Sequence, residues 1–166
     1  AIGEFATKGG LDPETGQGIA SPHWHQGAGA CEVEVDIETG KVKVLRYYAA
    51  SYAGRVVNPT LAKLQNDGNV IYGIGPALFE EMIFDGGQVT NPNLSDYLIP
   101  SFLDIPPKLV SVALEAEPGE FHGIGEMTLP PVAPAIANAI YDAVGVRIRD
   151  LPLTAEKVLR AIINGK

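Results

Sequence analysis

Two stretches in the first third of the chain alternate apolar and polar residues with a period of two. They read ACEVEVDI (residues 30–37) and KVKVLRYYAA (residues 41–50), and the segment ETG lies between them. Alternation of this kind puts every second side chain on one face of a strand, and a short connection that contains glycine is typical of a hairpin. The pattern therefore predicts two antiparallel strands joined by a tight turn.

A helical period replaces the alternation after GRVVNP (residues 54–59). Pro59 suits the first turn of a helix, and the pattern predicts a helix from there to Met82. Its apolar positions are Leu61, Leu64, Ile71, Ile74, Leu78 and Met82. Glycine costs about 1 kcal/mol relative to alanine inside a helix, so we expect close packing at Gly68, Gly73 and Gly75. Pro76 predicts a kink.

The rest of the chain predicts short strands, a loop and two further helices. A turn between short strands, a proline-rich loop and a strand are indicated by FDGGQVT (84–90), NPNLSDYLIPSFLDIPP (91–107) and KLVSVALEAE (108–117). One helix is expected from near Pro134 to Gly145, and the next follows Thr154 as its N-cap. This order predicts an α+β fold whose mixed sheet carries its helices mainly on one face, rather than a doubly wound parallel sheet.

The composition indicates one globular domain behind an N-terminal arm. The 166 residues are 46% hydrophobic and 19% charged, which suffices for a core and argues against disorder. Residues 1–28 are rich in glycine, proline, threonine and glutamine without a clean period. We therefore predict an extended arm or loop over 1–28 and a folded domain over 29–166.

The net charge and the cysteine content restrict the classes of partner and cofactor that we expect. The 12 basic and 20 acidic residues give a net charge of -8, which disfavours nucleic acid and anionic lipid. The single cysteine, Cys31, allows neither an internal disulfide nor an Fe–S cluster held by this chain alone. The sequence lacks an apolar run long enough for a membrane span and an N-terminal signal pattern. We expect a cytoplasmic protein without a membrane partner.

Glu126 stands out in HGIGEMTLPP (residues 122–131), among glycines, prolines and apolar residues. Burying an ionised carboxylate costs several kcal/mol unless it is paired, so this residue either faces solvent or has a chemical function. Two interpretations stay open. One is an exposed surface turn, and the other is a base in a turn whose glycines let a ligand approach the backbone.

Other candidates are weaker. His23, Trp24 and His25 form a group that offers at most two metal ligands, so contact with a partner or solvent is favoured. The carboxamide of Gln65 can bind a polar ligand, although a solvated helix residue is the simpler interpretation. A surface ion-pair cluster without a catalytic role is expected among Asp142, Arg147, Arg149 and Asp150.

Five segments then follow one another in a recognisable order. They are ACEVEVDIETGKVKVLRY, GRVVNP, the pattern Q-x-x-G-x4-G-x-G-x4-EE from Gln65 to Glu81, GIGE, and PVAPAIANAIYDAVGVRIRDLPLTAEKVL. Together they resemble the C-terminal half of the molybdopterin-binding subunit in the xanthine dehydrogenase/aldehyde oxidase family of molybdenum hydroxylases. The resemblance covers about residues 28–160.

The resemblance implies a C-terminal molybdopterin-binding part, as a subunit or a fragment, of an enzyme that hydroxylates an aldehyde, N-heterocycle or related small molecule with oxygen from water. It implies that Glu126 is the active-site base next to molybdenum, that Gln65, Gly68, Gly123 and Gly125 contact the cofactor, and that this chain supplies no metal ligand. Expected partners are the remainder of the molybdopterin-binding subunit and Fe–S and possibly flavin (FAD) subunits. The alternative is a non-catalytic assembly or binding module with the same fold and no cofactor.

Overall fold

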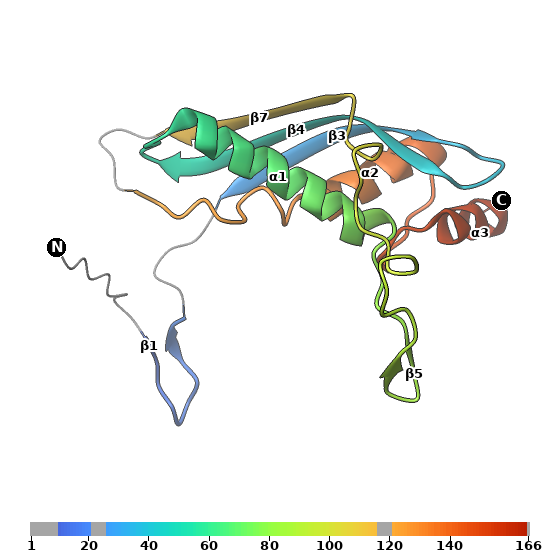
Figure 1. Cartoon of the computed structure of the whole chain (residues 1–166), viewed down its shortest axis with the longest axis horizontal. Coiled ribbons are helices and arrows are strands. Elements are labelled where there is room, and N and C mark those ends of the chain that lie inside the picture. Colours follow the sequence, from blue (N-terminus) through green and yellow to red (C-terminus); the bar gives the residue numbers. More distant parts are fainter. Residues whose placement is uncertain (1–9, 21–25, 116–120, 166) are drawn as a thin grey trace.

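A three-stranded mixed sheet forms the centre of the computed structural model, which describes residues 10–20, 26–115 and 121–165 (Figure 1). Strand β3 (Gly27–Val35) pairs antiparallel with β4 (Val42–Gly54), and β4 pairs parallel with β7 (Lys108–Glu115). The order is β3-β4-β7. The predicted hairpin and the predicted strand at residue 108 are thus confirmed, and they belong to one sheet.

The turn between β3 and β4 is closed by local hydrogen bonds. The carboxylate of Asp36 accepts hydrogen bonds from the backbone N–H groups of Glu38 and Thr39, at 2.9 and 3.2 Å. Gly40 has a φ of 74°, a conformation that other residues rarely adopt. The glycine in the segment between the two alternating stretches therefore has the role that the pattern predicts.

Helices α1 (Pro59–Leu78) and α2 (Val132–Val144) lie on the same face of the sheet, and α3 (Ala155–Asn164) follows beyond its end (Figure 1). Helix α1 packs on β4 and β7, while α2 packs on β3 and on α1. The predicted α+β fold with helices mainly on one face is confirmed.

The helix ends follow from capping residues. The side chain of Asn58 accepts a hydrogen bond from Leu61 N at 3.0 Å, Gly145 ends α2 in the left-handed conformation, and Thr154 caps α3 as predicted. Helix α2 begins two residues before Pro134. Helix α1 ends at Leu78 and not at Met82, because the backbone N–H groups of Phe79 and Glu80 both turn back to the carbonyl of Gly75.

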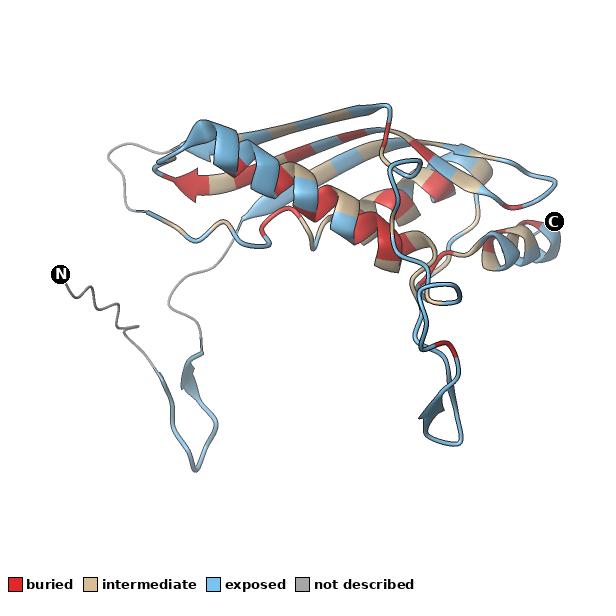
Figure 2. Ribbon diagram, viewed as in Figure 1, coloured by how far each residue is buried: buried red, intermediate tan, exposed pale blue. Residues whose placement is uncertain are grey.

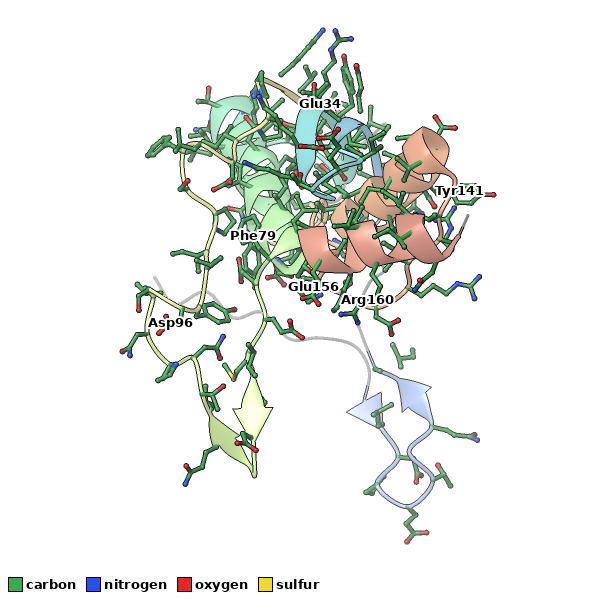
Figure 3. All side chains as sticks on the ribbon, turned by 90° about the vertical axis from the view of Figure 1, so that its right-hand side faces the viewer. Glu34, Phe79, Asp96, Tyr141, Glu156 and Arg160 are labelled. Atoms are coloured by element: carbon green, nitrogen blue, oxygen red, sulfur yellow. The ribbon has the colours of Figure 1, made fainter. Side chains whose placement is uncertain are left out.

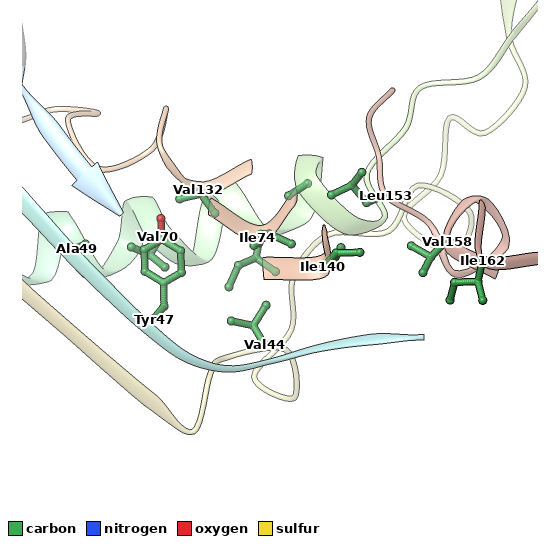
Figure 4. Packing of buried hydrophobic residues seen from close by; sticks show 12 residues of the cluster. Val44, Tyr47, Ala49, Val70, Ile74, Val132, Ile140, Leu153, Val158 and Ile162 are labelled. Atoms are coloured by element: carbon green, nitrogen blue, oxygen red, sulfur yellow. The ribbon is translucent and has the colours of Figure 1, made fainter. Parts of the chain in front are cut away.

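The core lies between the helices and the inner face of the sheet (Figure 4). Its buried members are Val44, Tyr47, Ala49, Val70, Ile74, Ala77, Val132, Ile136, Ile140, Leu153, Val158 and Ile162. Figure 2 shows the buried residues concentrated along this layer. Gly73 allows the close crossing of α1 and α2, since a Cβ there would lie 2.7 Å from Val132. Gly68, in contrast, has no atom within 4 Å of its Cβ position, so the expected close packing at Gly68 is absent among the described residues.

Two small hairpins extend away from the sheet in the same direction (Figures 1 and 3). One pairs β1 (Gly10–Leu11) with β2 (Gly18–Ile19), and the other pairs β5 (Phe84–Asp85) with β6 (Gln88–Val89), as FDGGQVT predicts. Asn91 fixes the base of the second hairpin through hydrogen bonds to Ile83 N and Glu81 O. Within the described ranges, none of the helices combines the length and apolar character that a membrane crossing requires.

Candidate functional site

The turn that contains Glu126 lies beside the first half of helix α1. The side-chain Nε2 of Gln65 donates a hydrogen bond to the backbone carbonyl of Gly125 at 2.6 Å. Gly54, at the end of β4, forms an isolated antiparallel bridge with Phe121, which leads the chain into this turn. The fold therefore brings together two site candidates, Gln65 and the GIGE segment, that are 60 residues apart in the sequence.

A second hydrogen bond joins the same helix to the same turn. The hydroxyl of Thr128 donates to the backbone carbonyl of Asn66 at 3.0 Å. The side chain of Asn66 is itself bonded to the hydroxyl of Ser51 on β4, with Nδ2 to Oγ at 2.9 Å and Oγ to Oδ1 at 3.2 Å. All three residues are almost fully buried, where a polar group needs a partner. Strand, helix and turn are thus connected by one buried polar chain.

Glu126 itself is exposed, although its two C-terminal neighbours, Met127 and Thr128, are buried. The backbone of Met127 packs against Gly27 of β3 so closely that a Cβ on Gly27 would collide with the Met127 carbonyl oxygen. Buried neighbours therefore hold the turn in place while the carboxylate points out of the core. Among the described residues nothing encloses it, so a sheltered pocket around Glu126 would need atoms from outside them.

A cavity of about 580 Å³ opens next to the turn, at the first turns of α1. It is lined by Ala53, Arg55, Val56, Val57, Asn58, Leu61, Ala62, Gln65, Phe121, His122, Ile124 and Gly125. The guanidinium of Arg55 lies 5.7 Å from the centre of the Phe121 ring, and the His122 ring contacts Tyr52. Mostly apolar walls with a few polar groups are typical of a site for a small molecule.

The other predicted site residues lie near this cavity without lining it. Gly68 follows Gln65 along α1 and is exposed, with open space where a side chain would be. Gly123 is exposed in the turn itself. His23, Trp24 and His25 lie outside the described residues. Within the described part of the chain, no group of three or more His, Cys, Asp or Glu side chains is arranged to hold a metal ion.

The prediction of an ion-pair cluster near the end of α2 is wrong. Arg147 donates a hydrogen bond to the side-chain oxygen of Asn138 at 2.7 Å and stacks on the ring of Tyr141. Neither Asp142 nor Asp150 forms an ion pair with a described residue. The guanidinium of Arg147 instead contacts the side-chain amide of Asn138 and the ring of Tyr141, both on α2.

Comparison with known proteins decides the family. The sequence model described as "Molybdopterin cofactor-binding domain" matches residues 1–106, well over half of the chain. The chain belongs to the molybdopterin cofactor-binding domain family. This assignment confirms the molybdopterin cofactor that the resemblance implies.

Individual relatives agree. This molybdopterin cofactor-binding domain is 40% identical over 134 residues to the aldehyde oxidoreductase molybdenum-binding subunit PaoC of Escherichia coli (strain K12), covering 77% of this chain and 18% of the relative. It is 44% identical over 133 residues to the putative xanthine dehydrogenase molybdenum-binding subunit XdhA of the same organism, covering 76% of this chain and 18% of that one. The chain thus spans about a fifth of the length of these relatives.

Solved structures show the same fold. The quinoline 2-oxidoreductase of Pseudomonas putida 86 superposes with a TM-score of 0.71 at 31% sequence identity, over 79% of this chain and 18% of that chain. The mixed sheet with helices on one face is therefore the architecture of a molybdopterin-binding region.

The residues of the candidate site fit such a cofactor. A pterin is a flat, polar heterocycle, and a carboxamide with nearby accessible backbone is the kind of surface that can pair with its donors and acceptors. Gly68 and Gly125 both have empty space at the Cβ position, so a ligand can approach the backbone there. Asn66, Ser51 and Thr128 were not among the candidates predicted from the sequence, because small polar residues carry no signal until the fold shows that they are buried and mutually bonded.

Proposed function

We propose that this chain is the C-terminal part of a molybdopterin-binding subunit, and that it contributes the base to the catalytic centre of a molybdenum hydroxylase. The observation that carries the proposal is the 2.6 Å hydrogen bond between Gln65 and the GIGE turn. It brings Gln65 next to the turn that carries Glu126, beside a cavity that Gln65 and Gly125 line. The relatives named as aldehyde oxidoreductase and xanthine dehydrogenase molybdenum-binding subunits support the reaction type.

In this proposal each residue has a separate role. The carboxylate of Glu126 accepts a proton during oxidation of an aldehyde, N-heterocycle or related small molecule. Gln65 contacts the molybdopterin through its carboxamide, and Gly68, Gly123 and Gly125 let the cofactor approach the backbone. When bound, the molybdenum cofactor supplies the redox chemistry, in which oxygen from water enters a C–H bond and two electrons leave the substrate.

The exposed position of Glu126 has a direct consequence for this reaction. A catalytic base works best where bulk water is excluded. Because this chain alone leaves the carboxylate open, the shelter has to come from the cofactor and from the remainder of the molybdopterin-binding subunit. The chain by itself is therefore not expected to turn over substrate.

A bare apolar patch supports a partner of this kind. Tyr48, Val110, Val112 and Leu114 lie on the face of the sheet opposite to α1 and α2, with 41 to 51% of each residue exposed. We call this group the outer patch. We propose that the remainder of the subunit covers it, that residues 1–28 act as an arm and 29–166 as the folded domain, and that Fe–S clusters and FAD reside on other domains or subunits.

The substitution Glu126→Gln in the assembled enzyme tests the proposal. It removes the proton acceptor and keeps the size of the side chain, so turnover should fall about 100-fold to 10,000-fold while molybdenum content stays unchanged. The matched control is Glu38→Gln, which changes an exposed glutamate in the β3–β4 turn and should leave turnover near the wild-type value.

Near-normal turnover of the Glu126→Gln enzyme with full molybdenum content would refute the assigned role. The alternative of a module without a cofactor makes a different prediction, because the native complex would then contain no molybdenum although its other subunits are intact. The family assignment does not favour that alternative.

A further inference from the structure

The Glu126 turn is attached to helix α1 on both sides of the carboxylate. On the N-terminal side, Gln65 Nε2 donates to the carbonyl of Gly125. On the C-terminal side, the hydroxyl of Thr128 donates to the carbonyl of Asn66. Two consecutive helix residues therefore hold the turn at two points, and only Glu126 and Met127 lie between these points.

The two attachments come from different directions. The first uses the side chain of Gln65, which projects from the surface of the helix, and the second uses the backbone carbonyl of Asn66, which in an α-helix points along the axis. One hydrogen bond alone would let the turn rotate about it, whereas two bonds from different directions fix both its position and its rotation. The two hydrogen bonds to the helix thereby fix the direction in which the side chain of Glu126 leaves the backbone.

The attachment through Thr128 is the better protected of the two. Gln65 is exposed, so water competes for its carboxamide, whereas Thr128 and Asn66 are both 0% exposed. A hydrogen bond away from water is electrostatically stronger than the same bond at the surface. Hydrogen bonds to Ser51 on β4 also fix the position of Asn66. The Glu126 turn is therefore held to the sheet through helix α1.

We propose that Thr128 is a positioning residue for Glu126, and that it acts through its hydrogen bond to the Asn66 carbonyl. The inference rests on the proposed function, because it assumes that Glu126 is the base. Displacing a reacting group by about 1 Å can cost about 100-fold in rate. The hydroxyl of Thr128 therefore sets the rate without contacting substrate or cofactor.

The experiment compares Thr128→Val with Thr128→Ser in the assembled enzyme. Valine keeps the shape and lacks the hydroxyl, and the Asn66 carbonyl retains the intrahelical bond that helix geometry gives it, so folding should be preserved. We expect Thr128→Val to lower kcat about 10-fold to 100-fold, with KM and molybdenum content unchanged. Thr128→Ser keeps the donor and should restore most of the rate. Should Thr128→Val fail to assemble, Thr128→Ala undergoes the same measurements.

Ser111→Ala is the matched control. The hydroxyl of Ser111 on β7 donates a hydrogen bond to the carboxylate of Asp67 on α1 at 2.5 Å. This bond joins α1 to β7 and does not involve the Glu126 turn. Removing it should leave kcat near the wild-type value. Hydrogen exchange gives a readout that is independent of activity: amides 125–128 should exchange faster in Thr128→Val than in Ser111→Ala.

The double variant Glu126→Gln/Thr128→Val separates this inference from the proposed function. If Thr128 acts through Glu126, the double variant should be no slower than Glu126→Gln alone. A slow Glu126→Gln enzyme together with a Thr128→Val enzyme of normal kcat would overturn the positioning role and leave the base intact. A Glu126→Gln enzyme of normal kcat would overturn both.

Discussion

The two faces of strand β4 differ sharply in how far this chain covers them. Tyr47, Ala49 and Ser51 on the inner face are 0 to 4% exposed, because α1 and α2 pack over them. Tyr48, their neighbour on the other face, is 41% exposed, and Val110 stands directly opposite it on β7. A shift of one residue along the strand thus separates a closed core from open apolar surface.

The outer face is itself divided. At one end Glu32 and Arg46 form an ion pair, which suits contact with water. At the other end Val110, Val112 and Leu114 of β7 point outward, while Leu109 and Ala113 alternate with them on the inner side together with Ser111. Parallel strands that read as nearly continuous apolar runs are usually buried on both faces. The comparison teaches that the chain completes one layer by itself and supports the proposal that the second layer belongs to the remainder of the subunit.

The largest effect on stability is expected on the inner face. Ile136 on α2 is fully buried in the core, so Ile136→Ala removes apolar contacts and leaves a cavity. We expect the free energy of unfolding to fall by about 2–5 kcal/mol. Urea unfolding of the purified chain, followed by circular dichroism, measures the change.

The matched control lies on the outer patch. Val112 is 47% exposed, so Val112→Ala should change the free energy of unfolding by only about 0.5 kcal/mol. Equal losses at the two positions would mean that the outer patch is already packed in the isolated chain, and the contrast between the faces would then fail.

An intermediate effect is expected when the outer patch meets its partner. Val112→Lys should leave the isolated chain folded, because a lysine stem can lie along the sheet with its ammonium in water. In the assembled subunit the same charge would be buried without a counter-charge. Binding of the chain to the separately produced remainder of the subunit should weaken by about 30-fold, which corresponds to about 2 kcal/mol.

Glu34→Lys is the control for this experiment. Glu34 is exposed on the charged end of the same face, opposite Lys43, and its substitution also introduces a lysine. We expect binding to change by less than about 3-fold. Unchanged binding of Val112→Lys, with the chain shown to be folded, would mean that the remainder of the subunit does not cover the patch.

Much of the fold could be predicted from local signals. The alternation around ETG determines the β3–β4 hairpin, and Pro59, Gly145 and Thr154 mark helix ends through backbone conformation and hydrogen bonding that depend on a few neighbours. The early end of α1 could not be predicted in this way. Apolar spacing continues to Met82, and only the tertiary structure shows that the backbone turns back to Gly75.

The candidate site was predictable only in part. Gln65 and Glu126 emerge from the resemblance, and the fold places Gln65 next to the turn. Gly68 was expected to pack closely because glycine is costly inside a helix, but the described chain has nothing against it. A glycine inside a helix predicts a close neighbour, but the sequence does not indicate whether that neighbour belongs to the same chain, to another chain or to a ligand. Thr128 has no distinctive pattern, since its role depends on Asn66, which is 62 residues away in the sequence.

A chemical comparison of the two faces uses Cys31, which lies on the inner side of β3. Burial raises the pKa of its thiol from 9.0 to about 11. Since the folded state binds this proton more tightly, the stabilisation is fully present below about pH 9 and is lost as the pH rises through 11. At pH 8 the lower thiolate fraction should slow alkylation by iodoacetamide about 100-fold relative to an unperturbed thiol.

Ala30→Cys in a Cys31→Ala background turns this measurement into a test of both faces. Residue 30 is exposed on the outer face, opposite Tyr48, so its thiol should titrate near the ordinary value and react rapidly in the isolated chain. Addition of the remainder of the subunit should slow alkylation at residue 30 in this variant and leave the rate at Cys31 in the wild-type chain unchanged, because α2 already covers β3 on the inner side. If residue 30 reacts equally fast in the assembled subunit, this part of the outer face stays open to solvent, and the remainder of the subunit must dock elsewhere.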